Sequence, residues 1–366
     1  MLRRLIERLF GRPAPAAGGD RLRAAQDAVR AGRLGEALTY YRALAATMPN
    51  ALDGPLGAGN VLVDLWRLDE ALAEYGKALA RAPQSRAIRS AVLFHRHYAA
   101  AIDAPALFEA HREAGRLFQQ KAVPALPPPA RATAGDRLRI GYVSPNFSRH
   151  SVGYFIEPVL RTHDRARFDV TCYYAHEKSD DATARMRALA DRWREVASID
   201  GAVLAEQIRA DGIDILVDLA GHSKGNKLAA FALKPAPLQV TWMGYPDTTG
   251  LSAIDLRVTD AVADPAPQAE ALHSERLARI DGCFLCYQPP ADSPPPGGRV
   301  NPATSVVFAS FNNIAKLNRP TIETWSAILA AVPGARLLLK SASLGYTETV
   351  ERVLEAFEDC GVEPGR

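Results

Sequence analysis

The sequence has few cysteines and no long apolar run, and both absences limit what the protein can be. Its four cysteines, Cys172, Cys283, Cys286 and Cys360, are too few and too scattered for a disulfide-stabilised secreted scaffold. Cys283 and Cys286 form a CxxC pair, but a tetrahedral zinc site needs a second pair, so we interpret them as part of a buried strand. No run approaches the roughly 18 apolar residues that cross a bilayer, so no membrane span is expected.

The charge balance and the amino terminus argue against a nucleic-acid-binding protein and against a secreted one. The net charge is only +3, so nothing demands a nucleic-acid partner. The opening segment MLRRLIERLFGRP is too short and too charged for a secretory signal, which makes a cytoplasmic location the default. We interpret it as a frayed terminus before a PAPAAGG linker, with a short basic amphipathic helix as the alternative.

The amino-terminal third contains a repeat. Residues 33–49 and 67–83 match at a constant offset of 34, which is the tetratricopeptide period. Each copy has a small residue that lets helices approach, an aromatic residue that fills the gap and a proline that ends the helix: Ala37, Tyr41 and Pro49, then Ala71, Tyr75 and Pro83. The preceding helices are predicted at about 20–31 and 52–65, with a degenerate third repeat at 84–99. The array could recognise a protein or brace the domain that follows it.

The pattern then changes to alternating strands and helices. A helix at 104–121 carrying an HRxxGxxF pattern leads to a Pro-rich boundary near 124–136. Beyond it, strands alternate with helices, which predicts a parallel doubly wound sheet with ligands at the carboxyl ends of its strands. The strands are expected at 138–144, 168–174, 214–219 and 238–244, and the helices at 156–163 and 182–193.

A second α/β unit is predicted after another Pro- and Gly-rich joint. Its strands are expected at 305–312 and 335–341, and its helices at 319–333 and 349–361, with Pro320 near a helix start and Gly361 as a cap. The chain ends where a further strand is expected, so we interpret it as two strands and two helices of a longer domain.

Several polar residues follow the predicted strands. His150 could bind a ligand or take a proton, or it could cap a helix. Lys224 and Lys227 could neutralise an acidic ligand or simply be solvated. Asp180 and Asp181 suggest a metal pair, but they directly precede a predicted helix, which favours a helix cap.

Several of these segments resemble one known family. Residues 220–226 and 234–250 are similar to the A-G-x-[ST]-x-G-[NA] loop and the K-P-A-P-[IL]-Q-x-x-W-x-G-Y-P-x-T-[ST]-G segment of glycosyltransferase family 41. That family contains the O-linked N-acetylglucosamine transferases and their SPINDLY-like relatives. The loop before His150 resembles the family's D-F-x-x-H-[SP] motif, with Asn146 in place of the usual Asp. The segment FNNIAK, which ends at Lys316, resembles its F-N-x-x-x-K motif, and the HRxxGxxF pattern resembles its linker helix.

The resemblance implies a fold and a reaction. The fold is tetratricopeptide helical repeats, then a Rossmann-like doubly wound domain, then the start of a second one, in a GT-B architecture. The reaction is metal-independent, cofactor-free transfer of N-acetylglucosamine from UDP-GlcNAc, with inversion, to Ser or Thr of a protein. It places His150 on the acceptor or base side and Lys316 on the phosphate side as catalytic residues. The implied substrate-binding residues are His222, Lys224, Gly244, Tyr245, Pro246, Thr248 and Asn313.

The sequence predicts four segments and leaves two alternative functions open. The expected segments are a basic terminus and linker (1–19), the repeats (20–123), a first Rossmann-like domain (137–290) and an incomplete second one (300–366). The repeats would present the acceptor protein. One alternative is a SPINDLY-like O-fucosyltransferase or another protein glucosyltransferase. The other is a non-catalytic tetratricopeptide adaptor with a truncated transferase domain.

Overall fold

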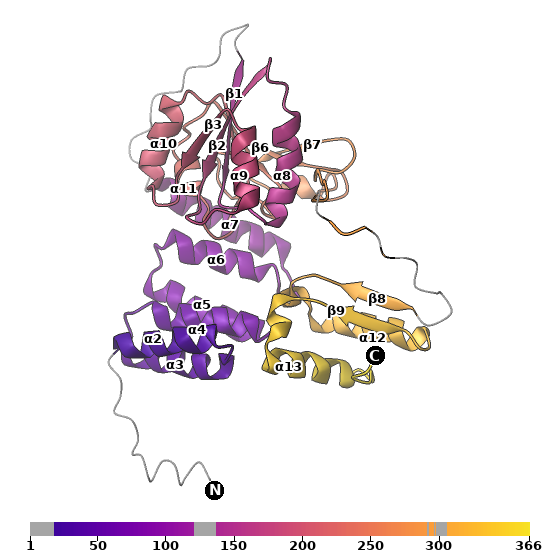
Figure 1. The fold of residues 1–366 in the computed structure, drawn as a ribbon. Helices are drawn as coiled ribbons and strands as arrows, with labels where there is room; N and C mark the ends of the chain where they lie inside the picture. Colours follow the sequence, from indigo (N-terminus) through magenta and orange to yellow (C-terminus); the bar gives the residue numbers. More distant parts are fainter. Residues whose placement is uncertain (1–17, 121–136, 291–292, 296, 298–305) are drawn as a thin grey trace. The chain divides into compact units, whose positions relative to one another are not determined.

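The chain forms two compact units (Figure 1). The computed structural model describes residues 18–120, 137–290, 293–295, 297 and 306–366. Among the described residues, the first unit comprises 18–88, 95–102, 297 and 306–366, and the second comprises 89–94, 103–120, 137–290 and 293–295. The amino-terminal segment and the Pro-rich boundary discussed above lie outside the described residues. None of the described helices is both long enough and apolar enough to cross a membrane.

Five helices between residues 18 and 96, all within the described part of the chain, confirm the predicted repeat. The rings of Tyr41 and Tyr75 lie over glycines of the helix between them: a Cβ added at Gly57 would lie 2.2 Å from the Tyr41 ring, and one at Gly59 would lie 2.5 Å from the Tyr75 ring. The repeated tyrosines therefore fill notches that only glycine leaves open. The helices are α2 (Gly18–Arg30), α3 (Leu34–Thr47), α4 (Asp53–Asp64), α5 (Leu68–Arg81) and α6 (Arg86–Arg96).

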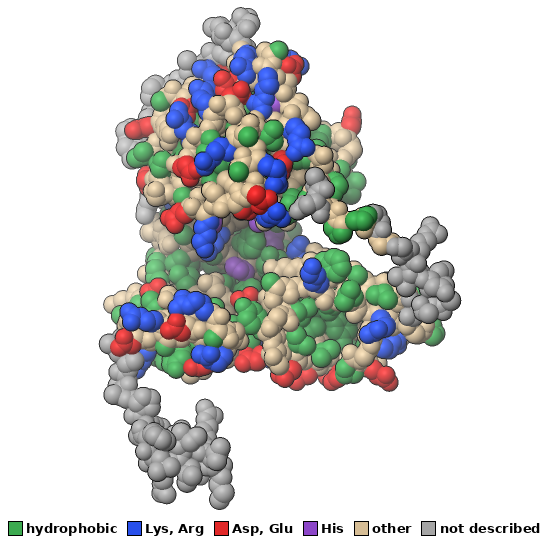
Figure 2. All heavy atoms as spheres, viewed as in Figure 1, with side chains coloured by type: hydrophobic (Ala, Val, Ile, Leu, Met, Phe, Trp, Pro, Cys, Tyr) green, Lys and Arg blue, Asp and Glu red, His purple; other side chains and the backbone are tan. Residues whose placement is uncertain are grey.

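The carboxyl-terminal segment of the first unit has the predicted two strands and two helices. Its elements are β8 (Val307–Ser310), η2 (Ile314–Lys316), α12 (Arg319–Ala331), β9 (Arg336–Leu339), η3 (Ala342–Gly345) and α13 (Thr347–Glu358). The two strands pair in parallel. Their helices bury Ile322, Leu329, Val353 and Phe357 in one core. Figure 2 shows hydrophobic side chains at the surface of this segment, where Val307 and Leu338 are more than half exposed.

A seven-stranded parallel sheet forms the second unit and confirms the doubly wound fold. Its order is β3-β2-β1-β4-β5-β6-β7, so the direction of winding reverses between β1 and β4. Ligands of such sheets bind in the crevice at this switch point, outside the carboxyl ends of the strands. The strands are β1 (Leu138–Ser144), β2 (Phe168–Tyr174), β3 (Arg192–Glu195), β4 (Ile215–Asp218), β5 (Leu238–Trp242), β6 (Leu256–Thr259) and β7 (Arg276–Arg279).

Both faces of this sheet are covered, as its apolar strands require. Alternate side chains of β2 point to opposite faces: Cys172 and Tyr174 pack with α8 (Ser151–Thr162) and α9 (Asp181–Leu189). Tyr173 packs on the other face with α10 (Gly201–Ala210) and α11 (Leu228–Phe231). Phe118 of α7 (Ala104–Gln120) belongs to that second core, so α7 is an integral part of the unit.

Contact between two glycines seats α7 against the loop after β5. A Cβ added at Gly115 would lie 1.8 Å from the carbonyl oxygen of Gly250, and one at Gly250 would lie 2.0 Å from the carbonyl oxygen of His111. Gly250 also has a φ of +73°, which favours glycine. The helix and the loop therefore meet backbone to backbone.

Three sequence-based interpretations are settled by the structure. The helix expected at 182–193 ends at Leu189, because residues 192–195 pair with β2 as an edge strand. The interpretation of the CxxC pair is wrong, since Cys283 and Cys286 are exposed and outside any strand. The Asp180 cap is confirmed, because its carboxylate accepts a hydrogen bond from the Thr183 amide in a capping box.

Candidate functional site

The loops after β1 and β4 flank the switch point of the seven-stranded sheet. Residues 145–150 follow β1, and residues 219–227 follow β4. The two loops touch, because a Cβ added at Gly225 would lie 3.0 Å from the Pro145 side chain. Polar residues of both loops therefore lie at the edge where a doubly wound sheet binds its ligands.

His150 lies in the first of these loops and caps α8. Its Nδ1 accepts a hydrogen bond of 3.2 Å from the Val152 amide, so the neutral ring carries its proton on Nε2. Protein atoms around the ring penalise the charged form and lower the pKa of His150. The residue as a whole is exposed at the surface. At neutral pH it thus offers an N–H donor, and its Nδ1 is occupied by the cap.

A neighbouring ion pair holds the His150 loop. The Arg149 amide donates to Asp180 at 2.8 Å, and its guanidinium donates two hydrogen bonds of 2.7 Å to Asp181. The hydrogen bonds from Arg149 keep the pKa of Asp181 well below its usual range. The two aspartates therefore tie the start of α9 to the loop that carries His150.

The buried carboxylate of Asp218 organises the loop after β4. It accepts hydrogen bonds from the Ala220 amide at 3.1 Å, the Gly221 amide at 2.8 Å and the Thr241 hydroxyl at 3.0 Å. Burial raises the pKa of Asp218 to about 6, although these hydrogen bonds favour the ionised form. Asp218 was not predicted as a site residue, because its only signal in the sequence is a carboxylate at the end of an apolar run.

His222, in the same loop, is fully buried and hydrogen-bonded at both ring nitrogens. Its Nε2 donates to the carbonyl oxygen of Thr249 at 2.8 Å, which leaves Nδ1 to accept from the Ser90 hydroxyl at 2.9 Å. The observed role of His222 is thus to link α6 and the loop after β5 to the loop after β4. Its predicted contact with a substrate stays a prediction.

Tyr245 lies in the turn after β5 and is also buried. Its hydroxyl bonds Nε2 of His111 at 2.8 Å, while Nδ1 of His111 donates to the Leu107 carbonyl at 2.8 Å. Desolvation raises the pKa of Tyr245 well above its usual range. A Cβ at Gly244 would lie 1.7 Å from the Leu219 carbonyl oxygen, so glycine is needed for this turn to meet the loop after β4.

Buried Glu275 holds Thr248 and Thr249, which follow the Tyr245 turn in the chain. Glu275 accepts from the Thr248 hydroxyl at 2.5 Å and from the Thr249 amide at 2.8 Å, and it is 5% exposed. The Thr248 hydroxyl in turn accepts from the amides of Gly250 and Ser274, each at 3.1 Å. The Thr248 hydroxyl therefore makes all its hydrogen bonds, one donated and two accepted, within the protein. Nothing in the sequence pattern indicated Glu275.

Other predicted site residues of this unit face water. Lys224 and Pro246 are exposed, and thus accessible to a ligand. Lys227 instead donates to the carbonyl oxygens of Ala197 and Ile199, both at 2.9 Å, and partial burial lowers its pKa. Of the two lysines in this loop, Lys224 is the one whose charge is exposed.

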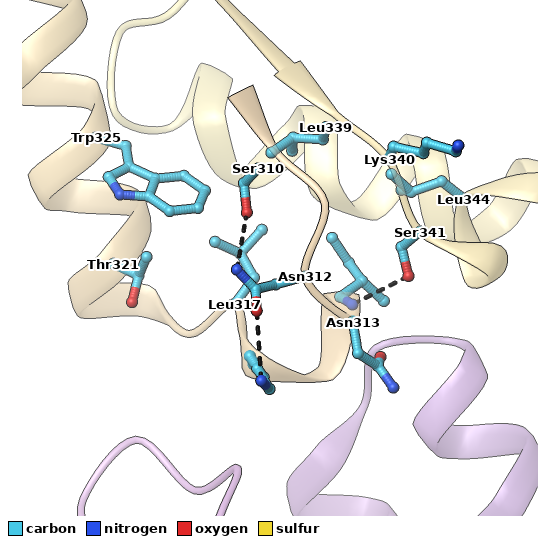
Figure 3. A pocket seen from close by; sticks show the side chains of 12 residues that line it. Ser310, Asn312, Asn313, Leu317, Thr321, Trp325, Leu339, Lys340, Ser341 and Leu344 are labelled. Atoms are coloured by element: carbon cyan, nitrogen blue, oxygen red, sulfur yellow. Dashed lines mark hydrogen bonds between the residues drawn. The ribbon is translucent and has the colours of Figure 1, made fainter. Parts of the chain in front are cut away.

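Lys316 and Asn313 lie together at a pocket in the first unit (Figure 3). The pocket has a volume of about 170 Å³ and opens beyond the carboxyl end of β8. Nζ of Lys316 donates to Asn312 at 3.3 Å, and the Asn313 side chain accepts from the Ala315 amide at 3.0 Å. The lining residues are Ser310, Asn312, Asn313, Ile314, Lys316, Leu317, Thr321, Trp325, Leu339, Lys340, Ser341 and Leu344.

The charge of this pocket suits an anion. Lys316 and Lys340 are its charged lining residues, and both are cationic. Thr321 lies in the first turn of α12, whose Asn318 cap accepts from the Thr321 amide. The amino-terminal end of a helix carries partial positive charge, which adds to that of the lysines. Phosphate oxygens are ligands that such a pocket favours.

Comparisons with known proteins all lead to one family. Residues 121–288 match the family described as Glycosyl transferase family 41. A tomato (Solanum lycopersicum) protein named probable UDP-N-acetylglucosamine–peptide N-acetylglucosaminyltransferase SPINDLY is 43% identical over 270 residues, covering 71% of this chain and 28% of that protein. The UDP-N-acetylglucosamine–peptide N-acetylglucosaminyltransferase of Caenorhabditis elegans is 39% identical over 154 residues, which are 41% of this chain and 13% of that protein.

A solved structure matches almost the entire chain. It is a mutant of the Thermobaculum terrenum O-GlcNAc transferase, with a TM-score of 0.86 and 36% sequence identity. The match covers 99% of this chain and 68% of that one. The chain thus spans about a quarter of the tomato relative's length and about two thirds of the bacterial one.

Proposed function

Because this chain belongs to glycosyl transferase family 41, we propose that it binds a nucleotide sugar and takes part in glycosyl transfer to a protein. The membership confirms the resemblance noted in the sequence. The proposed donor is UDP-N-acetylglucosamine, and the proposed acceptor is a Ser or Thr hydroxyl. The names of the relatives support both choices, since they describe UDP-N-acetylglucosamine–peptide transferases.

The observation that carries the proposal is the cationic pocket around Lys316. Transfer leaves a nucleoside diphosphate whose charge grows as the sugar departs, and a fixed cation stabilises that charge. Lys316 would donate to the diphosphate, with Lys340 and the first turn of α12 adding positive potential. These groups can take the role of a metal ion, so we propose that transfer continues in the presence of EDTA.

His150 would act on the acceptor side as a hydrogen-bond donor. Its Nδ1 is held by the Val152 amide, so the group presented to solvent in the neutral ring is Nε2–H. A donor there would orient a substrate oxygen, whereas removal of the acceptor proton would need an unprotonated nitrogen. The helical repeats would present the acceptor protein, a role that the repeat architecture favours.

Calorimetric titration of the full chain with UDP and with GDP tests the proposal. We expect UDP to bind and Lys316→Met to weaken binding by about 10- to 100-fold, as loss of one charge-assisted hydrogen bond predicts. Lys77→Met serves as the control, because Lys77 is an exposed lysine of the repeats paired with Glu74. Preference for GDP would redirect the proposal to a GDP-sugar donor. Failure of both nucleotides to bind would contradict the proposal for this chain and favour the adaptor alternative.

A further inference from the structure

The turn between α4 and α5 contains a tryptophan where the repeat favours glycine. Trp66 has a φ of +56°, in the left-handed region that side chains rarely adopt. The equivalent position one repeat earlier, 34 residues before it, is Gly32, with a φ of +73°. Both residues follow the last turn of the first helix of a repeat, where glycine is usual. Trp66 thus keeps the turn but adopts a strained backbone, and such strain occurs where surrounding contacts maintain it.

The contact that accompanies this strain is with the pocket backbone. The indole Nε1 of Trp66 donates a hydrogen bond of 2.6 Å to the carbonyl oxygen of Leu317. Its ring packs against the core of the carboxyl-terminal segment, which includes Ile314 and Leu317. Leu317 directly follows Lys316, and both line the pocket. The repeat turn is therefore bonded to the peptide unit next to the pocket lysine.

Asp64, two residues earlier, accepts two further hydrogen bonds from the same carboxyl-terminal segment. Its carboxylate accepts from the Ser343 hydroxyl at 3.1 Å, and its carbonyl oxygen accepts from the Thr349 hydroxyl at 2.7 Å. Ser343 lies in η3 between the lining residues Ser341 and Leu344. Thr349 lies in the first turn of α13 and is fully buried. One turn of the repeats thus holds η2, η3 and α13 together.

We infer that the turn from Asp64 to Trp66 is a positioning element of the Lys316 pocket, with Trp66 fixing the backbone that carries Lys316. A glycine at position 66 would satisfy the turn equally well, so packing of the repeats alone does not explain a tryptophan there. The inference rests on the proposed function in one respect, that the ligand of the pocket is a nucleoside diphosphate. Its consequence is that the repeats act on nucleotide binding through this turn.

Two variants of the full chain separate the indole from the backbone. Trp66→Phe keeps an aromatic ring and removes the N–H donor, while Trp66→Gly relieves the backbone and removes the ring. Trp193→Phe is the matched control, because the indole N–H of Trp193 is buried with no hydrogen-bond partner among the described residues. All three variants, with the wild type, are compared by amide hydrogen exchange and by UDP and GDP titration.

We expect faster exchange at two amides in both Trp66 variants, those of Lys316, the last residue of η2, and of Leu317, its cap. The Lys316 amide donates to the Asn313 carbonyl at 3.0 Å, and the Leu317 amide donates to the Ile314 carbonyl at 2.9 Å. Their exchange should accelerate about 10-fold in Trp66→Phe, and nucleotide affinity should fall about 10-fold, as loss of one hydrogen bond predicts. Trp66→Gly should exceed both effects while its α3 amides exchange as in the wild type, and Trp193→Phe should match the wild type.

The possible outcomes separate this inference from the proposed function. Unchanged exchange at Lys316 and Leu317 in both Trp66 variants overturns the inference, whatever the nucleotides do. Unchanged affinity in variants of a nucleotide-binding wild type also overturns it and leaves the proposed function intact. If the wild type binds neither UDP nor GDP, the proposed function fails for this chain, and faster exchange in the Trp66 variants still supports the positioning role.

Discussion

The Tyr245 hydroxyl donates a hydrogen bond of 2.8 Å to Nε2 of His111. The direction follows from the other ring nitrogen, because Nδ1 of His111 faces the Leu107 carbonyl and must carry the proton. Tyr245 belongs to the turn after β5, and His111 belongs to α7. The helix that precedes the sheet therefore fixes the turn whose residues are predicted to bind the substrate.

Replacing Tyr245 by Phe should destabilise the protein. The change removes the buried hydroxyl that donates to Nε2 of His111. Loss of one partner of a buried hydrogen bond costs about 1–3 kcal/mol of unfolding free energy. A double-mutant cycle with His111→Leu should give a coupling energy of about 1 kcal/mol by urea denaturation.

Tyr142→Phe is the control for that cycle. The Tyr142 hydroxyl bonds Nε2 of His163 at 2.9 Å, but His163 is only half-buried, so water can replace the lost partner. A smaller loss of stability is expected there. Additive effects of the Tyr245 and His111 changes, within about 0.3 kcal/mol, would show that the bond contributes no net stability.

Replacing Gly115 by Ala should strongly destabilise the second unit. The new Cβ would lie 1.8 Å from the Gly250 carbonyl oxygen, so α7 must move away from the loop after β5. We expect a loss of at least 3 kcal/mol, at the upper end of the range for overpacking. Thermal unfolding followed by circular dichroism measures the change.

The matched control is Gly76→Ala in α5. A Cβ at Gly76 would meet no atom within 4 Å, so alanine should stabilise the helix by about 0.5–1 kcal/mol. Opposite signs for the two glycine-to-alanine changes would establish close packing as the cause. A Gly115→Ala protein that melts with the wild type would rule out the backbone contact between α7 and the loop.

Local periodicity predicted most of the fold, and it fails where long-range pairing decides the structure. The offset of 34 predicted the helical pairs, and β1 and β2 have the predicted bounds because long apolar runs define them. The edge strand β3 was missed, since RWRE alone reads as the end of a helix and becomes a strand only by pairing with β2. Short β6 and β7 were missed for the same reason.

The candidate site was predicted in part, because sequence identifies residue types but not which nitrogen or oxygen faces a ligand. His150 and Lys316 follow strands, as expected. His222 and Thr248 proved to be hydrogen-bonded within the protein by partners far away in the chain, namely Ser90 and Glu275. No local pattern reveals such pairs.

Replacing Asp218 by Asn should alter how stability depends on pH. The folded pKa of about 6 lies above the ordinary value of 3.8, so the folded state binds this proton more tightly than the unfolded chain. The stabilising contribution of Asp218 to the unfolding free energy should therefore fall by about 1.4 kcal/mol per pH unit as the pH rises from about 4 to about 6.

Asparagine cannot titrate, so Asp218→Asn removes this dependence. It also costs about 1–3 kcal/mol, since its NH₂ group would face one of the donors that bond the carboxylate. The stability advantage of the wild type should be largest near pH 4 and smallest above pH 6, measured by urea denaturation. Asp281→Asn, at an exposed carboxylate, is the control. An advantage that is constant across this range would show that Asp218 does not titrate there.

Two replacements of His150 separate its cap from its donor. Asparagine is a good helix cap, so His150→Asn should keep the stability of α8, whereas His150→Ala should lose about 1 kcal/mol. Both lose Nε2–H, so both should impair acceptor glycosylation equally if that proton orients a substrate.

The pKa of His150 is lowered, so its stabilising contribution is present above about pH 6.5 and is lost as the pH falls through the lowered folded pKa. The wild type should therefore lose stability relative to His150→Asn on acidification below pH 6.5, as measured by thermal unfolding in matched buffers. Equal acid sensitivity of the two proteins would mean that His150 is not held neutral by the fold, and full activity of His150→Asn would remove Nε2–H from the reaction.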